Sequence, residues 1–303
     1  MEFLKKEFDK KGSIFRFSIK DQTTKKVTDF YKNKPFPNYK SDDNKATILS
    51  RGNHNLLAHC FKKFIGQNKK ILEVGCGTGQ LSIFFSIGTN NKIVGLDPTE
   101  ESLQLASNFS QSNKIENVNF VNADIFDDVL QDNYFDFIWC NGVLHHTKNP
   151  YEGFKITLKS LKKEGYILVG LYNKIGRIRT KVRAYFYKIF GKKLIMKLDP
   201  ILRNLKSDSE DQINAWIQDQ YIHPVESCHT IDEVLNWFDQ NDVEFISSIP
   251  KTNFEETDFE KIFEKKDKGS FVSRLINQIL MIFTNLGSDG GLFVVVGKKK
   301  SKN

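Results

Sequence analysis

Short apolar runs alternate with helical patterns from residue 69 onward. The runs are rich in Val, Ile, Leu and Phe and are bounded by turn-forming residues, which is typical of buried strands. Between them, apolar residues recur at helical spacing over 79–87, 99–111 and 150–163. Because near-continuous apolar strands separated by helices indicate a parallel sheet covered on both faces, we predict a doubly wound α/β core. The first five predicted strands are 69–75, 92–97, 118–124, 134–140 and 165–172.

The C-terminal part of the chain continues this core, but its predicted helix and strands no longer alternate regularly. Thr230 followed by Glu233 forms a capping-box pattern, which predicts a helix over 230–240. Two further apolar runs, 243–250 and 291–298, predict strands six and seven. The predicted fold is therefore a doubly wound, seven-stranded, mostly parallel sheet of Rossmann-like type.

Two segments fall outside the regular alternation. Residues 173–229 follow strand five and predict an α-helical insertion, whereas 251–289 contains an amphipathic pattern at 270–286 that fits a helix packed on the core or on a partner. We expect four parts: an N-terminal leader or lid (1–68), the first half of the core (69–172), a basic helical cap (173–229) and the C-terminal part of the core (230–303).

The positive charge of the chain is concentrated in one segment. The formal net charge of the 303 residues is +8, but residues 171–206 hold many Lys and Arg and a single acid, Asp199. The remainder is close to neutral, so overall basicity does not by itself indicate a nucleic-acid partner. The four cysteines form no C-x-x-C pair, and we find neither a secretory signal pattern nor an apolar run long enough to span a membrane. These features predict a cytoplasmic protein.

The first predicted strand runs into a glycine-rich loop, ILEVGCGTGQ at 71–80. Gly75, Gly77 and Gly79 allow a ligand to approach the backbone closely. A dinucleotide fingerprint requires G-x-G-x-x-G, but its third position is Gln80 or Ser82, depending on the starting glycine. The Lys-Ser/Thr of a phosphate-binding Walker loop is also absent. A nicotinamide-dependent dehydrogenase is therefore disfavoured.

An acidic residue, Glu73, ends the first strand and is better suited to a cation than to a phosphate. The pattern E-x-G-x-G-x-G resembles the first motif of class I S-adenosylmethionine-dependent methyltransferases, and the resemblance extends motif by motif over about 70–172. It implies that S-adenosylmethionine is the cofactor. The cofactor-binding residues that it implies are Glu73, Gly75, Cys76, Gly77 and Gly79 in the loop, Asp97 and Pro98 at the ribose, Asp124 and Ile125 at the adenine, and Asn141, Gly142 and Val143 at the methionine side.

Two of these residues also have purely structural explanations. Asp97 precedes Pro98 and fits a helix N-cap, a role compatible with ribose binding. Asp124 fits an ordinary loop carboxylate as well as an adenine ligand.

His145 and His146 follow the fourth strand, where an acceptor would reach the cofactor. Histidine titrates near neutrality, so either residue fits a general base, and both also fit packing beneath the loop. The same segment lacks the N-P-P-Y type of sequence associated with methylation of exocyclic base amines, which argues against N-methylation of adenine or cytosine.

The residues after strand five are expected to select the acceptor. Tyr172, Asn173 and Arg177 follow that strand directly, at the sheet edge where ligands bind in α/β folds. The basic amphipathic pattern within 174–206 fits a solvated face, a gate for an anionic acceptor, a membrane surface or RNA contact. In the segment 220–230, His223 is a candidate acceptor ligand, with a structural loop as the alternative; the spacing matches no known metal motif, and we predict no metal.

The sequence therefore predicts a methyltransferase acting on an oxygen or carbon of a small-molecule acceptor, with anionic and lipid- or carrier-linked acceptors as open choices. Two alternatives stay open: a tRNA or RNA methyltransferase that uses the basic helix, and a non-catalytic member that binds cofactor or a partner. The identity of the acceptor and the oligomeric state are not encoded in any pattern that we recognise.

Overall fold

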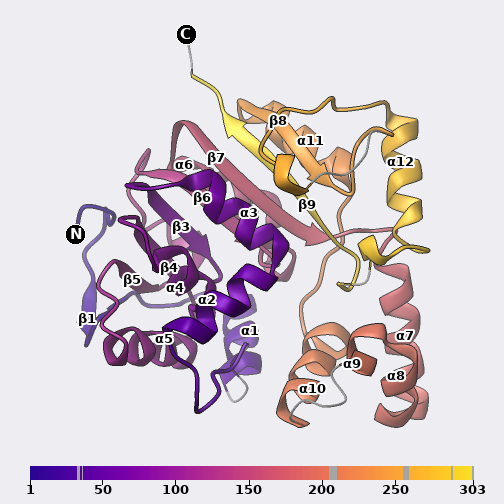
Figure 1. Cartoon of the computed structure of the whole chain (residues 1–303), viewed down its shortest axis with the longest axis horizontal. Coiled ribbons are helices and arrows are strands. Elements are labelled where there is room, and N and C mark those ends of the chain that lie inside the picture. Colours follow the sequence, from indigo (N-terminus) through magenta and orange to yellow (C-terminus); the bar gives the residue numbers. More distant parts are fainter. Residues whose placement is uncertain (33–34, 36, 205–209, 255–258, 288, 302–303) are drawn as a thin grey trace.

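The computed structural model describes residues 1–32, 35, 37–204, 210–254, 259–287 and 289–301. Its centre is a mixed sheet with the strand order β1-β2-β5-β4-β3-β6-β7-β9-β8 (Figure 1). The strands are β1 (Asp9–Lys11), β2 (Ile14–Arg16), β3 (Lys70–Val74), β4 (Lys92–Asp97), β5 (Val118–Asn122), β6 (Phe135–Asn141), β7 (Leu161–Tyr172), β8 (Val243–Ile249) and β9 (Leu292–Lys299).

The sheet has nine strands, so the prediction of seven was wrong in number. The two additional strands come from the leader: β1 and β2 form a short hairpin, and β2 pairs in parallel with β5 at the sheet edge. Each has three residues, too few to show a clear alternation in the sequence. The seven predicted strands are all present, and among them β9 runs antiparallel to its neighbours β7 and β8.

The helices cover both faces of the sheet. One hydrophobic cluster includes Phe154 of α6 and Phe238 of α11, whereas the other includes Phe61 of α3, Phe84 of α4 and Leu103 of α5. The α-helices are α1 (Gln22–Lys32), α2 (Lys45–His54), α3 (Leu56–Ile65), α4 (Gln80–Ser86), α5 (Glu100–Ser112), α6 (Pro150–Lys159), α7 (Ile178–Phe190), α8 (Lys192–Leu198), α9 (Pro200–Asn204), α10 (Glu210–Ile217), α11 (Ile231–Gln240) and α12 (Phe271–Leu280).

One predicted boundary was wrong at the junction of α6 and β7. The helical pattern extended to residue 163 and the strand began at 165, but the helix ends at Lys159 and the strand begins at Leu161. The strand accommodates the turn-like residues through an irregularity in its pairing with β6, and Glu164 adopts a positive φ of 63°. The pairing of Leu161 with Phe135 therefore extends the strand through residues 162–165, whose sequence KKEG is typical of a turn.

Helices α7 to α10 follow β7 and form a separate lobe beneath the sheet edge, which we call the cap (Figure 1). The cap has its own small core, made of Ile195, Leu202, Ile213, Ile217 and Tyr221. At its centre, the buried carboxylate of Asp199 accepts a 2.9 Å hydrogen bond from the indole of Trp216 and pairs with Arg183 at 3.3 Å. A helical segment after strand five is thus present, and its description as an insertion stays a prediction.

Candidate active site

A cavity of about 540 Å³ lies at the carboxyl ends of the central strands, between the sheet and the cap. Its wall combines the glycine loop after β3 with the ends of β4, β5, β6 and β7 and with residues of α1, α2 and α10. Such an edge is where ligands bind in α/β sheets, because the loops that follow parallel strands converge there.

The glycine loop leaves room for a ligand by a backbone conformation that side chains disfavour. Gly75, Gly77 and Gly79 have φ values of 67°, 51° and 71°. A Cβ on Gly75 would lie 2.4 Å from a methyl of Val143, and one on Gly79 would lie 2.7 Å from the ring of Phe120. Glycine is therefore required at both positions for space as well as for φ.

Asp97 is held at the cavity wall by two backbone donors. Its two carboxylate oxygens accept hydrogen bonds from the amides of Gly77, at 2.8 Å, and Thr99, at 2.7 Å. Burial raises the pKa of Asp97, and the two amide hydrogen bonds oppose that rise. Each oxygen retains a lone pair, so the carboxylate can still accept hydrogen bonds from two neighbouring hydroxyls.

Glu73 lies under the loop with its side chain almost fully buried. Ser82 donates a hydrogen bond to its carboxylate, but desolvation dominates and raises the pKa of Glu73 to about 8. Because Glu73 also lines the cavity, a cationic ligand there would stabilise its ionised form.

Asp124 contacts the leader helix α1. One carboxylate oxygen accepts a 3.0 Å bond from the amide of Phe126, and the other accepts a 2.6 Å bond from the hydroxyl of Thr24. Thr24 and Val27 of α1 line the same cavity as Ile125. The leader therefore closes this end of the cavity.

Asn141, at the end of β6, presents an acceptor without a partner. Its Oδ1 is buried and has no hydrogen-bond partner among the described residues. A Cβ on Gly170 would lie 1.6 Å from that oxygen, so the neighbouring strand leaves space for the amide. A ligand carrying an N–H or ammonium donor fits this orphaned acceptor.

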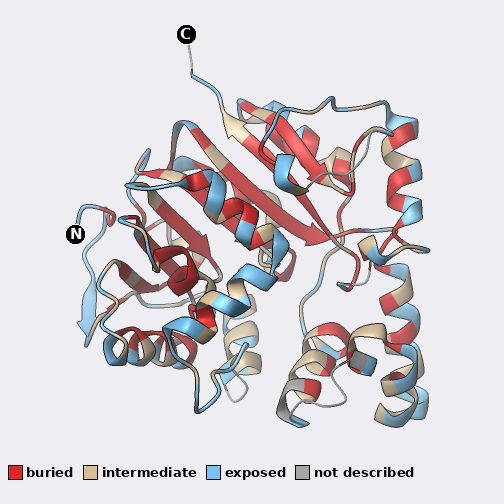
Figure 2. Cartoon of the chain, in the orientation of Figure 1, coloured by how far each residue is buried: buried red, intermediate tan, exposed pale blue. Residues whose placement is uncertain are grey.

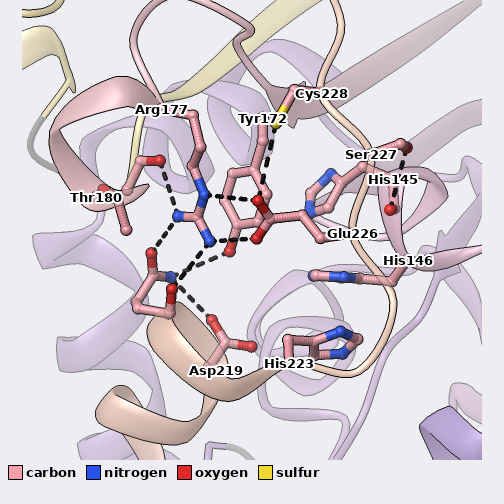
Figure 3. A network of polar contacts seen from close by, with 12 residues as sticks. His145, His146, Tyr172, Arg177, Thr180, Asp219, His223, Glu226, Ser227 and Cys228 are labelled. Atoms are coloured by element: carbon pink, nitrogen blue, oxygen red, sulfur yellow. Dashed lines mark hydrogen bonds and ion pairs between the residues drawn. The ribbon is translucent and has the colours of Figure 1, made fainter. Parts of the chain in front are cut away.

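The two histidines after β6 have different environments (Figure 3). His146 lines the cavity, and its Nδ1 lies 2.7 Å from the carbonyl oxygen of Val225, which fixes the neutral tautomer with the lone pair on Nε2. His145 is fully buried against the ring of Tyr172, with centroids 4.0 Å apart, and neither of its ring nitrogens has a hydrogen-bond partner among the described residues. Burial lowers the pKa of both histidines.

Arg177 is fully buried behind the cavity and does not line its wall (Figure 3). Its guanidinium forms a bidentate pair with Glu226, at 3.2 and 2.5 Å, and donates to the carbonyl of Gly290 at 2.9 Å. It also stacks on Tyr172, with 3.5 Å between Cζ and the ring centroid. These contacts tie the end of β7 to the segments before α11 and β9.

Five residues that line the cavity were not singled out from the sequence. They are Arg51, Trp139, Trp216, Asp219 and Gln220. Asp219 and Gln220 belong to a π-helix, Gln218–Ile222, and Asp219 accepts a 2.7 Å bond from Tyr31 of α1. π-Helices are rare and occur frequently at functional sites, but they leave no periodicity that a sequence shows.

The predicted site residues divide into two groups. The predicted cofactor residues line the cavity with the exception of Gly79, which caps α4, and His146 and Tyr172 line it too. His145, Asn173, Arg177 and His223 lie outside its wall. The side chain of Asn173 is occupied by Gln278 and by the amides of Ile175 and Gly176.

Within the described ranges, no three His, Cys, Asp or Glu side chains are arranged to hold a metal ion.

A comparison with protein families completes this picture. The profile of the family described as a methyltransferase domain matches residues 65–267. The chain belongs to the methyltransferase domain family. It is a class I member, and S-adenosylmethionine is its cofactor, in agreement with the glycine cradle, the orphaned acceptor of Asn141 and the buried acids beside them.

Individual relatives are distant. An uncharacterised protein from Synechococcus is 23% identical over 77% of this chain and 61% of its own length. The ubiquinone biosynthesis O-methyltransferase of Shewanella pealeana is 30% identical over 44% of this chain and 53% of its own length. The solved structure of PKMT2 from Rickettsia typhi in complex with AdoHcy has a TM-score of 0.55 at 14% identity, covering 82% of this chain and 53% of that one. The chain thus spans about half to three fifths of the length of these proteins.

Proposed function

We propose that this methyltransferase transfers the methyl group of S-adenosylmethionine to a hydroxyl oxygen of a small, uncharged acceptor that enters beneath the cap. The observation that carries the proposal is one continuous cavity, lined at one end by Gly75, Asp97 and Asp124 and at the other by His146 and Trp216. When bound, the cofactor supplies an electrophilic methyl on a sulfonium. The protein then has to align the acceptor, exclude water and accept its proton.

The charge of the cavity wall favours a neutral acceptor over an anionic one. Among the described residues that line the cavity, Arg51 is the only Lys or Arg, and it is already engaged by Asp43, at 2.7 Å, and by Gln80. Arg177, the sequence-based candidate for binding an anion, has its donors occupied by protein groups. An anionic acceptor would therefore lose hydration without gaining a free cation.

His146 is our proposed general base. The hydrogen bond at Nδ1 leaves the lone pair of Nε2 for the acceptor proton, and the lowered pKa keeps the imidazole neutral at pH 7. We assign His145 a packing role, because it lies behind Tyr172 and outside the cavity. Tyr172 and Gln220 are the proposed acceptor contacts, and Arg177, which donates to Gln220 and stacks on Tyr172, positions them from behind.

The proposed role of the leader and cap is to close over the reactants. The hydroxyls of Thr24 and Tyr31 connect α1 to Asp124 on the sheet and to Asp219 beside the cap. The relatives named as ubiquinone biosynthesis O-methyltransferases support oxygen as the acceptor atom, although the match covers less than half of this chain.

The test is incubation of the purified full chain with methyl-tritiated S-adenosylmethionine and separate panels of phenols and alcohols, carboxylic acids, amines and RNA. We expect label in a neutral hydroxyl compound, lost in His146→Gln and retained in His54→Gln, an exposed histidine outside the cavity. Label in carboxylic acids or RNA alone would refute the choice of acceptor. Cofactor binding without labelling of any panel would favour the non-catalytic alternative.

A further inference from the structure

Two helices at one edge of the molecule carry their apolar residues on the outside. On α7, the exposed positions include Ile178, Val182, Tyr185 and Ile189, which follow one another at helical spacing. The buried positions of the same helix are Thr180 and Arg183. Ala184, Phe186 and Tyr187 of this helix pack on the cap core, so the exposed stripe is a second apolar surface that faces solvent.

Helix α12 buries polar side chains and exposes apolar ones. Its buried residues are Ser273, Asn277 and Gln278, whereas the exposed apolar side chains on it and just after it are Phe271, Val272, Ile276, Ile279, Leu280 and Phe283. Phe283 is 76% exposed. In Figure 2, α12 is exposed on the side that faces away from the sheet and buried on the side towards it.

The polar inner face of α12 is built into the protein by specific hydrogen bonds. Ser273 donates to the carbonyl of Thr252 at 2.7 Å, and Asn277 donates to that of Asn253 at 2.9 Å. The side-chain oxygen of Gln278 accepts from Asn173 at 2.8 Å and from the amide of Ile231 at 3.1 Å. These bonds fix the rotation of the helix, so the apolar stripe cannot turn inwards without leaving buried polar groups unpaired.

The two helices adjoin along the same edge (Figure 1). Arg179 of α7 donates to the carbonyl of Thr284, just beyond α12, at 3.2 Å, and Gly176 lies against Met281. Exposed apolar side chains from two neighbouring helices exceed the scattered single residues found on ordinary protein surfaces. We call this surface, formed by the exposed apolar residues of α7, α12 and Phe283, the α7–α12 face.

The charge around the α7–α12 face distinguishes among its occupants. Residues 173–198 contain no acid, and Lys181 and Lys188 are exposed beside the apolar stripe of α7. Residues 268–288 contain no acid either. A second copy of this chain would bring like charges together, whereas anionic lipid headgroups complement lysines and acyl chains accept Ile, Leu and Phe. RNA would use the lysines but would leave the apolar residues unexplained.

We propose that the α7–α12 face docks this protein onto an anionic membrane surface, with both helices lying in the headgroup region. The helices are too short to cross a bilayer, and no helix in the described part of the chain is long and apolar enough to do so. This mode of attachment relies on shallow burial of apolar side chains together with lysine–headgroup attraction. The proposal is independent of the acceptor, so its failure would leave the proposed methyl transfer untouched.

The test is co-flotation of the full chain with vesicles of phosphatidylcholine alone or mixed equally with phosphatidylglycerol. Binding is expected to the mixed vesicles and to weaken with salt. The pair Val182→Gln with Ile189→Gln, and separately Ile276→Gln with Phe283→Gln, should each lower partitioning by about tenfold or more. Leu56→Gln is the matched control, because Leu56 and Val182 are both 49% exposed and Leu56 lies on α3.

A second pair of variants tests the charge. Lys181→Gln with Lys188→Gln should lower partitioning on the mixed vesicles by about thirtyfold, because each lysine near an anionic surface contributes about 1 kcal/mol and the two together contribute about 2 kcal/mol. Far-UV circular dichroism and thermal unfolding of each variant establish that it remains folded. No vesicle binding, or binding unchanged in both apolar pairs, would overturn the proposal. So would a concentration-dependent dimer that the apolar variants dissociate, or RNA binding that only the lysine variants abolish.

Discussion

Glu73 provides the sharpest quantitative test of the cofactor end of the cavity. Its pKa rises from the ordinary value of 4.5 to about 8 in the folded protein, because burial penalises the carboxylate. A group whose pKa is raised on folding stabilises the folded state below its unfolded pKa, and that stability is lost as the pH rises through the folded value. At about 1.36 kcal/mol per pKa unit, the shift corresponds to about 5 kcal/mol of unfolding free energy lost between pH 4.5 and 8.

The variant Glu73→Gln removes this titration and keeps the shape of the side chain. Without cofactor, the free energy of unfolding of the wild type should fall relative to the variant as the pH rises from 5 to 9, by an amount of the order of 5 kcal/mol. Urea unfolding at matched pH values measures this difference. Parallel pH profiles for the two proteins would refute the account of a buried, proton-binding Glu73.

Cofactor binding should reverse the effect of burial, because a cationic ligand stabilises the carboxylate. With a pKa of about 8, about nine tenths of Glu73 is protonated at pH 7, so binding should release close to one proton. Calorimetric titration in two buffers with different ionisation enthalpies counts that proton. Glu73→Gln should release correspondingly less, and equal proton release by both proteins would contradict an interaction between Glu73 and the cofactor.

Three further predictions concern the proposed base His146, the buried Arg177 and the glycine loop. The value of kcat/KM should fall as the pH drops through a value below 6.5, because His146 must be neutral to accept a proton and its pKa is lowered. His146→Gln should abolish this acid limb of the pH profile. An acid limb that survives in the variant would exclude His146 as its source. Arg177→Met should lower the free energy of unfolding by about 3 kcal/mol or more, because it leaves Glu226 and Gln220 without their buried donor. Lys192→Met, which removes an exposed ion pair with Glu210, should have little effect. Equal effects of the two variants in urea unfolding would contradict a structural role for Arg177. Gly79→Ala should lower the free energy of unfolding by about 2 kcal/mol more than Gly66→Ala does. Both glycines have φ near 70°, but only a Cβ at Gly79 meets other atoms within 4 Å. Similar melting temperatures for the two variants would show that the contact with Phe120 relaxes freely.

The convergence of the predicted cofactor residues on one cavity could be anticipated, because these residues lie within short motifs at the ends of successive strands. Asp97 and Asn141 are the last residues of β4 and β6, and Asp124 follows β5; apolar periodicity reveals these strands, and parallel strands bring their carboxyl ends to one edge. Other parts of the cavity wall could not be predicted in this way, because Arg51, Trp216 and Asp219 come from α2, α10 and a π-helix that are far apart in the sequence. No local pattern encodes their convergence.

Periodicity in the chain determined that α7 and α12 are amphipathic, since it fixes which residues share a helical stripe. Only the tertiary structure decided which way each stripe faces. Gln278 accepts a hydrogen bond from the distant amide of Ile231, and Asn277 donates one to the carbonyl of Asn253. These bonds hold the polar side of α12 inwards, and Arg179 connects α7 to the end of α12. Arg177 shows the same difference between sequence and structure. Its charge suggests a role in binding the substrate, but in the folded protein its donors are occupied by Glu226 and Gln220. A sequence specifies the chemical groups and their local spacing, whereas burial and long-range pairing decide which of those groups remain available to a ligand.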